Sequence, residues 1–132
     1  MSDPSVRVQL DGDRRAYQPG EVLSGSFRLH AVEGRAVGPV EVSVRWYTEG
    51  KGDEDSGVHH LEVLTPGEGR TDAGAGGRFA VSLPRSPLSY DGLIVKVRWC
   101  VRVRAPVAGW SDRVAEAAFR LGDVGPAPGA AA

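Results

Sequence analysis

Hydrophobic and polar residues alternate most regularly over residues 93–107, which read LIVKVRWCVRVRAPV. Every odd position of this stretch is apolar, and four of the six even positions up to residue 104 are basic. A period of two with β-branched residues is typical of a strand that has one buried face and one solvated face. Such a strand would span about 50 Å, which is longer than most strands, so we expect a bend or bulge within it.

The same alternation predicts shorter strands elsewhere, separated by glycine, proline and acidic residues that are typical of turns. These strands are residues 6–10, 21–30, 40–47, 58–64, 79–83 and 113–121. Within 21–30, Gly25 is expected to mark a bulge or a close backbone approach. Within 58–64, we expect Leu61 and Val63 to be core residues, beside His59. Trp46 and Trp99 fall on inward positions and should fill the core.

Seven short strands and no room for a three-turn helix predict an all-β protein, an immunoglobulin-like β-sandwich. The length of 132 residues fits one domain, which we place at residues 5–121. Residues 122–132 have no apolar pattern, so we expect a disordered tail there. The glycine-rich stretch 65–77 should be a long, mobile loop.

Composition and charge exclude several classes of function. The net charge is −1, so no overall basic excess points to nucleic acid as a partner. No apolar segment approaches the roughly 18 residues of a membrane span, and the first ten residues lack the pattern of a signal peptide. We therefore expect no membrane span and a cytoplasmic location.

The chain offers no set of residues suited to catalysis or to a cofactor. Cys100 is the single cysteine, so neither an intramolecular disulfide nor a cysteine metal cluster can form. His59 and His60 are adjacent on a predicted strand, so their side chains should point to opposite faces and not share a metal. Residues 67–77 lack the Gly-Lys-Ser/Thr ending of a phosphate-binding loop. We predict a protein without enzymatic activity, cofactor or metal.

The acidic loop of residues 48–57 allows one alternative, a cation site. An EF-hand loop requires oxygen ligands at positions 1, 3 and 5 and a glutamate at position 12. Asp53 and Asp55 match the first two positions, but Gly57 occupies the third and Leu64 the last. A polar hairpin loop is the simpler interpretation.

Two motifs resemble those of arrestin-like domains. Residues 17–26, YQPGEVLSGS, are similar to the PGE-x-x-x-G signature that lies early in these domains. The later run FAVSLP, at residues 79–84, is followed by SPLSYDG and then by the long strand, in the same order as in that family. The resemblance covers most of residues 6–121.

This resemblance implies an immunoglobulin-like sandwich without catalytic machinery, used as a scaffold that binds other proteins. Members of the family usually carry two such domains in tandem, whereas this chain has strands for one. It also lacks the Pro-Pro-x-Tyr motif that recruits ubiquitin ligases. The chain therefore looks most like the short, single-domain bacterial relatives.

The strongest local signal is a group of basic residues on the solvated side of the predicted strands. In an immunoglobulin-like sandwich the third, sixth and seventh strands share a sheet, so their outward residues lie on one face. Six basic residues and two acidic ones, Glu41 and Glu116, occupy these positions, which leaves an excess of four positive charges. The basic residues are Arg45, Lys96, Arg98, Arg102, Arg104 and Arg120.

This face predicts a surface for an acidic or phosphorylated segment of an unidentified protein partner, because the planar guanidinium donates paired hydrogen bonds to carboxylate and phosphate. Arg45, Lys96, Arg98, Arg102 and Arg104 are its candidate binding residues. The alternative is a solvated face whose arginines pair with the carboxylates of residues 53–55.

Other binding hypotheses remain open. An exposed edge strand would accept a partner strand by β-augmentation, and exposed edges also make a homodimer a reasonable hypothesis. Trp110, in the turn before the last strand, is a further candidate binding residue if it is exposed. Together with Tyr47 it would form an aromatic platform for a glycan or small molecule. Cys100 lies between Arg98 and Arg102, which would lower its pKa if it were exposed, although an inert thiol is the simpler interpretation.

Overall fold

The computed structural model describes residues 3–50, 54–65, 71–72, 76–92 and 95–122, and within these ranges the regular structure is strand apart from one 3-10 turn, η1 (Asp11–Asp13). All seven predicted strands are present, together with three strands of two residues each that the alternation did not predict. The strands are β1 (Ser5–Leu10), β2 (Ala16–Tyr17), β3 (Val22–His30), β4 (Val40–Gly50), β5 (Ser56–Leu64), β6 (Thr71–Asp72), β7 (Gly76–Ser82), β8 (Tyr90–Asp91), β9 (Val95–Ala105) and β10 (Arg113–Leu121).

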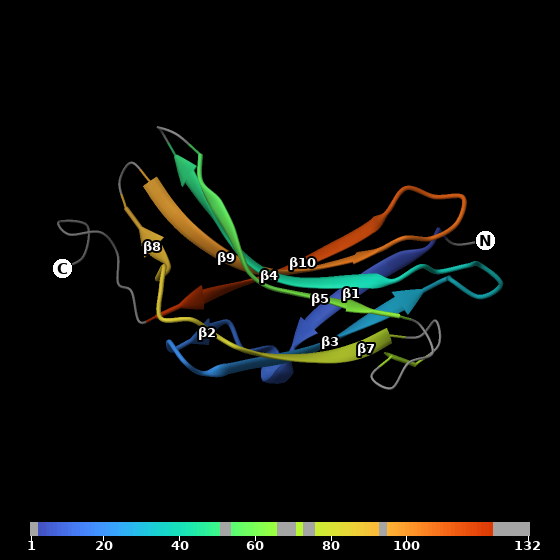
Figure 1. Ribbon diagram of the computed structural model, residues 1–132, viewed down its shortest axis with the longest axis horizontal. Coiled ribbons are helices and arrows are strands. Elements are labelled where there is room, and N and C mark those ends of the chain that lie inside the picture. Colours follow the sequence, from blue (N-terminus) through green and yellow to red (C-terminus); the bar gives the residue numbers. More distant parts are fainter. Residues whose placement is uncertain (1–2, 51–53, 66–70, 73–75, 93–94, 123–132) are drawn as a thin grey trace.

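The strands form two sheets that pack face to face (Figure 1). One sheet has the order β1-β3-β7-β6, and the other has the order β2-β10-β9-β4-β5, with β8 beside one end of β9. The third, sixth and seventh predicted strands, now β4, β9 and β10, do share a sheet. The prediction of an all-β, immunoglobulin-like sandwich is therefore confirmed.

The core lies between the sheets and is filled by the predicted inward positions. Trp99 is its largest fully buried side chain, and its Nε1 donates a hydrogen bond of 2.7 Å to the backbone oxygen of Pro87. The Trp99 ring packs against Phe119 with the ring centroids 5.8 Å apart. Around this pair lie residues of both sheets, among them Leu23, Phe27, Val42, Val44, Phe79, Val81, Val101, Val103 and Leu121.

The two motifs that carry the arrestin-like resemblance meet in space. Gly20 takes a left-handed conformation, with φ of 84°, and its N–H donates to the backbone oxygen of Leu83 at 3.1 Å. Leu83 N–H in turn donates to the oxygen of Glu21 at 2.9 Å. The Glu21 carboxylate closes the turn by accepting from Gln18 N at 2.7 Å and from Arg14 Nη2 at 2.6 and 2.8 Å.

Gly25 in β3 marks a close approach, as its position in the alternation predicted. A Cβ atom there would lie 2.5 Å from the backbone oxygen of Gln9 and 2.8 Å from Phe79 Cζ. Both distances are shorter than van der Waals contact, so the strands β1 and β3 and the ring of Phe79 pack this closely only because residue 25 has no side chain.

The long strand β9 bends, but it contains no bulge. Its pairing with β4 runs without interruption from Val95, opposite Gly50, to Arg104, opposite Glu41. Figure 1 shows β9 and β4 curving away from the other sheet at one end, so that the outer face of their sheet is concave. The expected bend is therefore present as a continuous curvature of the whole sheet.

One predicted core assignment, in β5, is wrong. Leu61 and Val63 are 57% and 54% exposed. They lie opposite Ser43 and Glu41, which belong to the outer face of β4, whereas the inward positions of β5 are taken by His60, Glu62 and Leu64. The alternation showed that the two faces of this strand differ, but it could not show which face the other sheet would cover.

Three predictions concern residues outside those that the structure describes. These are the mobility of the loop at 66–70 and 73–75, the disorder of the tail from residue 123, and the part of the acidic loop at 51–53. The rest of that predicted loop is a hairpin, because β4 continues to Gly50 and β5 begins at Ser56. None of the described segments forms a helix with the length and hydrophobicity that crossing a membrane requires.

Candidate functional site

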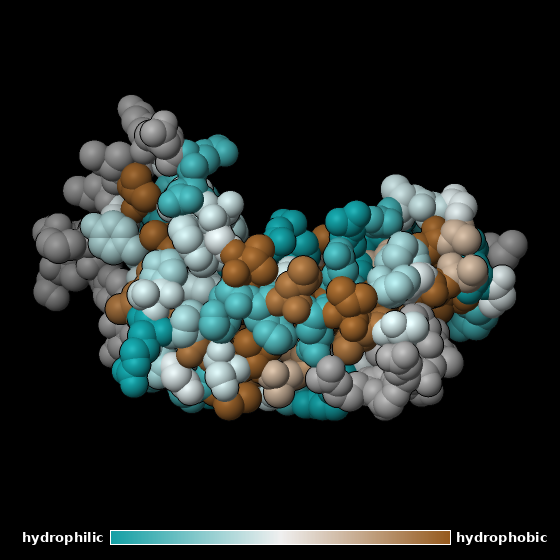
Figure 2. Space-filling view, viewed as in Figure 1, coloured by the Kyte–Doolittle hydropathy of each residue, from teal (hydrophilic) through white to brown (hydrophobic). Residues whose placement is uncertain are grey.

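The candidate site is the concave outer face of the β5-β4-β9-β10 sheet. Figure 2 shows this face in profile, as a hollow along the upper side of the molecule. The register places Arg45 of β4 directly opposite Cys100 of β9. On the same face, Arg98 and Arg102 lie two residues to either side of Cys100, and are thus diagonal neighbours of Arg45. We call Arg45, Arg98 and Arg102 the arginine triad.

Each cation on the outer face of β9 has a carboxylate partner. The partners come from β4, from β10 and from the segments that precede β9 and β10. All these pairs are partly exposed, so each contributes little to stability. The pairs are Lys96–Asp91 (3.6 Å), Arg98–Glu49 (3.5 Å), Arg102–Glu116 (2.7 Å), Arg104–Glu41 (3.6 Å) and Arg104–Asp112 (2.6 Å).

Arg45 is different from the cations of β9. It is half-buried, and its Nε atom is buried without a hydrogen-bond partner. No carboxylate in the described part of the chain lies within ion-pair distance of it. Two members of the arginine triad, Arg98 and Arg102, therefore have a carboxylate counter-ion, whereas Arg45 has none among the described residues.

The outer face carries a smaller excess of positive charge than the outward residues of the predicted strands indicated. Glu49, Asp91 and Asp112 join Glu41 and Glu116 there, whereas the loop carboxylates Glu54 and Asp55 do not pair with its arginines. Arg120 lies beyond the last β9 pair, opposite Ala16 of β2. Glu49 continues the outward series of β4 by one more period, which is the signal that could have identified it.

Cys100 is on the outer face by register but is only 4% exposed. Its Sγ lies 3.9 Å from Glu116 Oε2. Burial, together with the nearby Glu116 carboxylate, raises the pKa of the Cys100 thiol to about 11. The flanking arginines act in the opposite direction but do not prevail, so the hypothesis of a lowered pKa is wrong.

Trp110 lies in the turn between β9 and β10 and is 37% exposed. The guanidinium carbons of Arg35 and Arg113 lie 5.3 and 5.5 Å from the centroid of its ring. Cation–π contacts with arginine are typical at these distances. Neither arginine was singled out from the sequence. Tyr47 lies opposite Arg98, toward the other end of β9, so Tyr47 and Trp110 do not form one aromatic platform.

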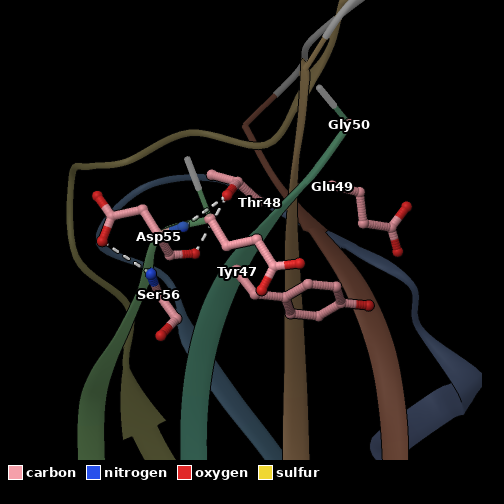
Figure 3. Close-up of a pocket in the computed structure, with 7 residues that line it drawn as sticks. Tyr47, Thr48, Glu49, Gly50, Asp55 and Ser56 are labelled. Carbon is pink, nitrogen blue, oxygen red and sulfur yellow. Dashed lines mark hydrogen bonds between the residues drawn. The ribbon is translucent and has the colours of Figure 1, made fainter. Parts of the chain in front are cut away.

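The described residues at the end of β4 and the start of β5, 47–50 and 54–56, line an open hollow of about 570 Å³ (Figure 3). Thr48 and Asp55 join its two sides, because Asp55 N donates to Thr48 Oγ1 at 2.8 Å. The side chains of Glu49 and Asp55 point to opposite sides of the hairpin, and Glu49 pairs with Arg98. Across the described ranges, no three histidine, cysteine, aspartate or glutamate residues are grouped to hold a metal ion.

The two adjacent histidines lie on the same side of β5, contrary to the prediction. The register between β4 and β5 shifts between Val44 and Arg45, and this bulge leaves His59 without an opposite residue. His59 Nε2 lies 2.8 Å from the backbone oxygen of Ser82 on β7, while His60 lies opposite the buried Val44. The bulge thus turns both side chains toward the other sheet.

Comparison with known proteins shows similarity in fold. No family model matches the sequence, and no curated protein matches it. Among solved structures, the sporulation control protein Spo0M from Bacillus subtilis superposes with a TM-score of 0.65 at 17% identity, over 92% of this chain and 50% of that one. Superoxide reductase (neelaredoxin) from Ignicoccus hospitalis gives 0.50 at 8% identity, over 89% of this chain and 80% of that one.

These similarities concern the fold alone, because both identities are low. The chain spans about half the length of Spo0M. The agreement with Spo0M supports the arrestin-like architecture that the sequence motifs predicted. This chain folds as an arrestin-like β-sandwich.

Proposed function

We propose that this protein is a non-enzymatic interaction module, a bacterial form of the arrestin-like sandwich that acts in the cytoplasm. Its concave outer face binds an acidic or phosphorylated segment of another protein. The observation that carries this proposal is Arg45, whose Nε is buried without a partner and which has no described carboxylate within ion-pair distance. A partly buried cation without a counter-ion is costly, so an incoming anion is stabilised there.

The neighbours of Arg45 support the same ligand chemistry. Arg98 and Arg102 are its diagonal neighbours, and the ion pairs that they make with Glu49 and Glu116 are partly exposed. Exposed pairs contribute about 0–1 kcal/mol each, so a bound anion can replace these carboxylates at little cost. A phosphate group offers three acceptor oxygens and can bridge two members of the arginine triad.

The shape of the face supports an extended ligand. The hollow in Figure 2 runs between the two raised ends of the curved sheet, where the charged residues of β4 and β9 lie beside the exposed apolar side chains of β5. The exposed arginines and carboxylates of this face can form hydrogen bonds along an extended peptide. So open a face does not enclose a small molecule. The name of Spo0M, a sporulation control protein, is consistent with a regulatory role for such a sandwich.

The test uses fluorescent peptides of about twelve residues with alternating glutamate and serine, prepared with and without phosphate on the serines. Anisotropy titrations should show binding that weakens steeply with salt, because the contacts are ionic. Arg45→Ala should weaken it at least tenfold. Arg28→Ala is the matched control, since Arg28 is exposed on β3 and no described carboxylate pairs with it either.

Equal loss in the two variants would contradict the proposal, because it would reflect net charge and not the arginine triad. Equal binding of a glutamine-serine peptide, or binding unaffected by salt, would contradict an ionic site on this face. Circular dichroism of each variant establishes that it is folded. No binding of any acidic peptide at low salt would remove the proposed function.

A further inference from the structure

The strand β5 lies at an edge of the concave sheet. It pairs with β4 on one side, and no described strand pairs with its other side. Three of its outward residues, Val58, Leu61 and Val63, are 53%, 57% and 54% exposed. Figure 2 shows apolar side chains following β5 along the front of the molecule.

Edge strands usually carry features that prevent pairing with another chain, such as lysine, proline, bulges and inward charges. The nine residues of β5 include neither lysine nor proline, but β5 does carry the bulge at His59 and the inward Glu62, whose Oε1 lies 3.9 Å from His60 Nε2 of the same chain. The bulge at His59 interrupts the strand at its fourth residue, so the regular part that can accept another strand begins at His60. Within this part the outward positions are Leu61 and Val63, and the inward ones are His60 and Glu62.

We propose that β5 pairs with β5 of a second copy of this chain, antiparallel about a two-fold axis through Leu61. In this register Leu61 lies opposite the partner's Leu61, and His60 lies opposite the partner's Glu62. Directly opposite residues of an antiparallel pair are close enough for their side chains to interact. The pairing therefore joins an apolar contact on the outer face to two histidine–glutamate contacts on the inner face.

Other registers of the same pairing are less favourable. A two-fold axis through Glu62 would set two glutamates opposite each other, and an axis through His60 would set two histidines opposite each other. A shift by a single residue would place inward residues opposite outward ones, which the alternation of a sheet does not allow. In the register centred on Leu61, each histidine of β5 thus faces a glutamate carboxylate of the second β5, to which an imidazole N–H can donate.

The dimer gives the exposed apolar side chains a partner. Leu61 contacts the partner's Leu61 directly, and Val63 lies diagonal to it across the axis. The two concave sheets become one continuous sheet, because β4 and β5 of each copy join through the axis. The arginine triad lies on β4 and β9 and not on the edge strand itself, so both copies keep it.

Light scattering coupled to size exclusion tests the oligomeric state between about 10 and 500 μM. A dimer is expected for the wild type, and Leu61→Glu should weaken its association at least tenfold. His60→Glu should also weaken it, whereas the exchange His60→Glu with Glu62→His should restore it. A wild type that is monomeric throughout, or a Leu61→Glu variant that dimerises normally, would overturn the proposal.

Cysteine cross-linking tests the register. Leu61→Cys should form an interchain disulfide under mild oxidation, because the two copies of residue 61 face each other across the axis. Val63→Cys is the matched control: its side chain is equally exposed, but its two copies are about 13 Å apart along the strands. The native Cys100 is buried and does not compete. Equal cross-linking of both variants would overturn the register.

The dimer and the proposed peptide site can be separated. His60→Glu, whose side chain faces the other sheet and not the concave face, should weaken the dimer yet leave binding of the acidic peptide within twofold of wild type, and Arg45→Ala should leave the dimer intact. Loss of dimerisation in Arg45→Ala would place the interface on the concave face and overturn the β5 contact.

Discussion

Arg102 and Glu116 lie directly opposite each other on β9 and β10, and Arg102 Nε donates a hydrogen bond of 2.7 Å to Glu116 Oε2. The same carboxylate oxygen lies 3.9 Å from the Cys100 thiol. Glu116 therefore lies beside the arginine triad, where the proposed binding mode places an anionic ligand. If that proposal holds, Glu116 competes with the ligand for Arg102.

Removing this competitor should strengthen binding to the proposed site. Glu116→Gln keeps the size of the side chain but not its charge, so Arg102 no longer has a carboxylate opposite it. We expect the affinity for the acidic peptide to rise about three- to tenfold, measured by anisotropy at low salt. Asp11→Asn is the control, because it removes the partner of Arg78 on the other sheet and should change affinity little. Unchanged affinity in Glu116→Gln would argue against a role for Arg102.

The Cys100 thiol should be unreactive in the folded protein. Its pKa, raised to about 11 by burial and by Glu116, leaves roughly one thiolate in a thousand molecules at pH 8. Labelling with a disulfide reagent at pH 8 should be at least a hundredfold slower than in urea. Val114→Cys is the control, since Val114 is 51% exposed on the same face, and its new thiol should react within the mixing time. Rapid labelling of the folded wild type would show that the sheet around Cys100 opens and exposes the thiol to solvent.

Gly25→Ala should destabilise the sandwich by about 1–3 kcal/mol, because the new methyl group enters the contact with Gln9 and Phe79. Urea unfolding measures this as a lower midpoint with an unchanged slope. Ala80→Val, at an exposed position of the neighbouring strand β7, should change stability by less than about 0.5 kcal/mol. Equal stability of the two variants would mean that β1 moves away from β3 without cost.

The turn at Glu21 should contribute to stability at neutral pH and not in acid. Hydrogen bonds from Arg14 and from the backbone N–H of Gln18 hold the pKa of the Glu21 carboxyl below its usual range. A lowered folded-state pKa adds stability above the usual pKa, and this stability is lost as the pH falls toward the folded value. Thermal midpoints of wild type and Glu21→Gln should therefore differ by a few degrees at pH 7 and converge in acid.

The control for this comparison is Glu33→Gln. Glu33 is exposed, and none of the ion pairs among the described residues includes it. Its curve should follow the wild type at every pH. A Glu21→Gln curve parallel to wild type down to pH 2 would assign the loss to packing and not to the charge.

The alternation of residue types determined most of the architecture. The buried faces of β3, β4, β7, β9 and β10 follow from it, because a strand with a period of two exposes one face and buries the other. The same rule placed the arginines of β9 on the outside. The two motifs that carry the arrestin-like resemblance were also found in the sequence, and backbone hydrogen bonds between Gly20 and Leu83 join them.

Only the tertiary structure decided which face of β5 is covered and which member of the arginine triad has no carboxylate partner among the described residues. Leu61 and Val63 face outward because the bulge at His59 and the edge position set the orientation of β5, and alternation alone does not specify orientation. Arg98 meets Glu49 and Arg102 meets Glu116 because strand register brings distant residues together. Residue pattern is a local property of the chain, whereas ion pairing and burial depend on which strands become neighbours.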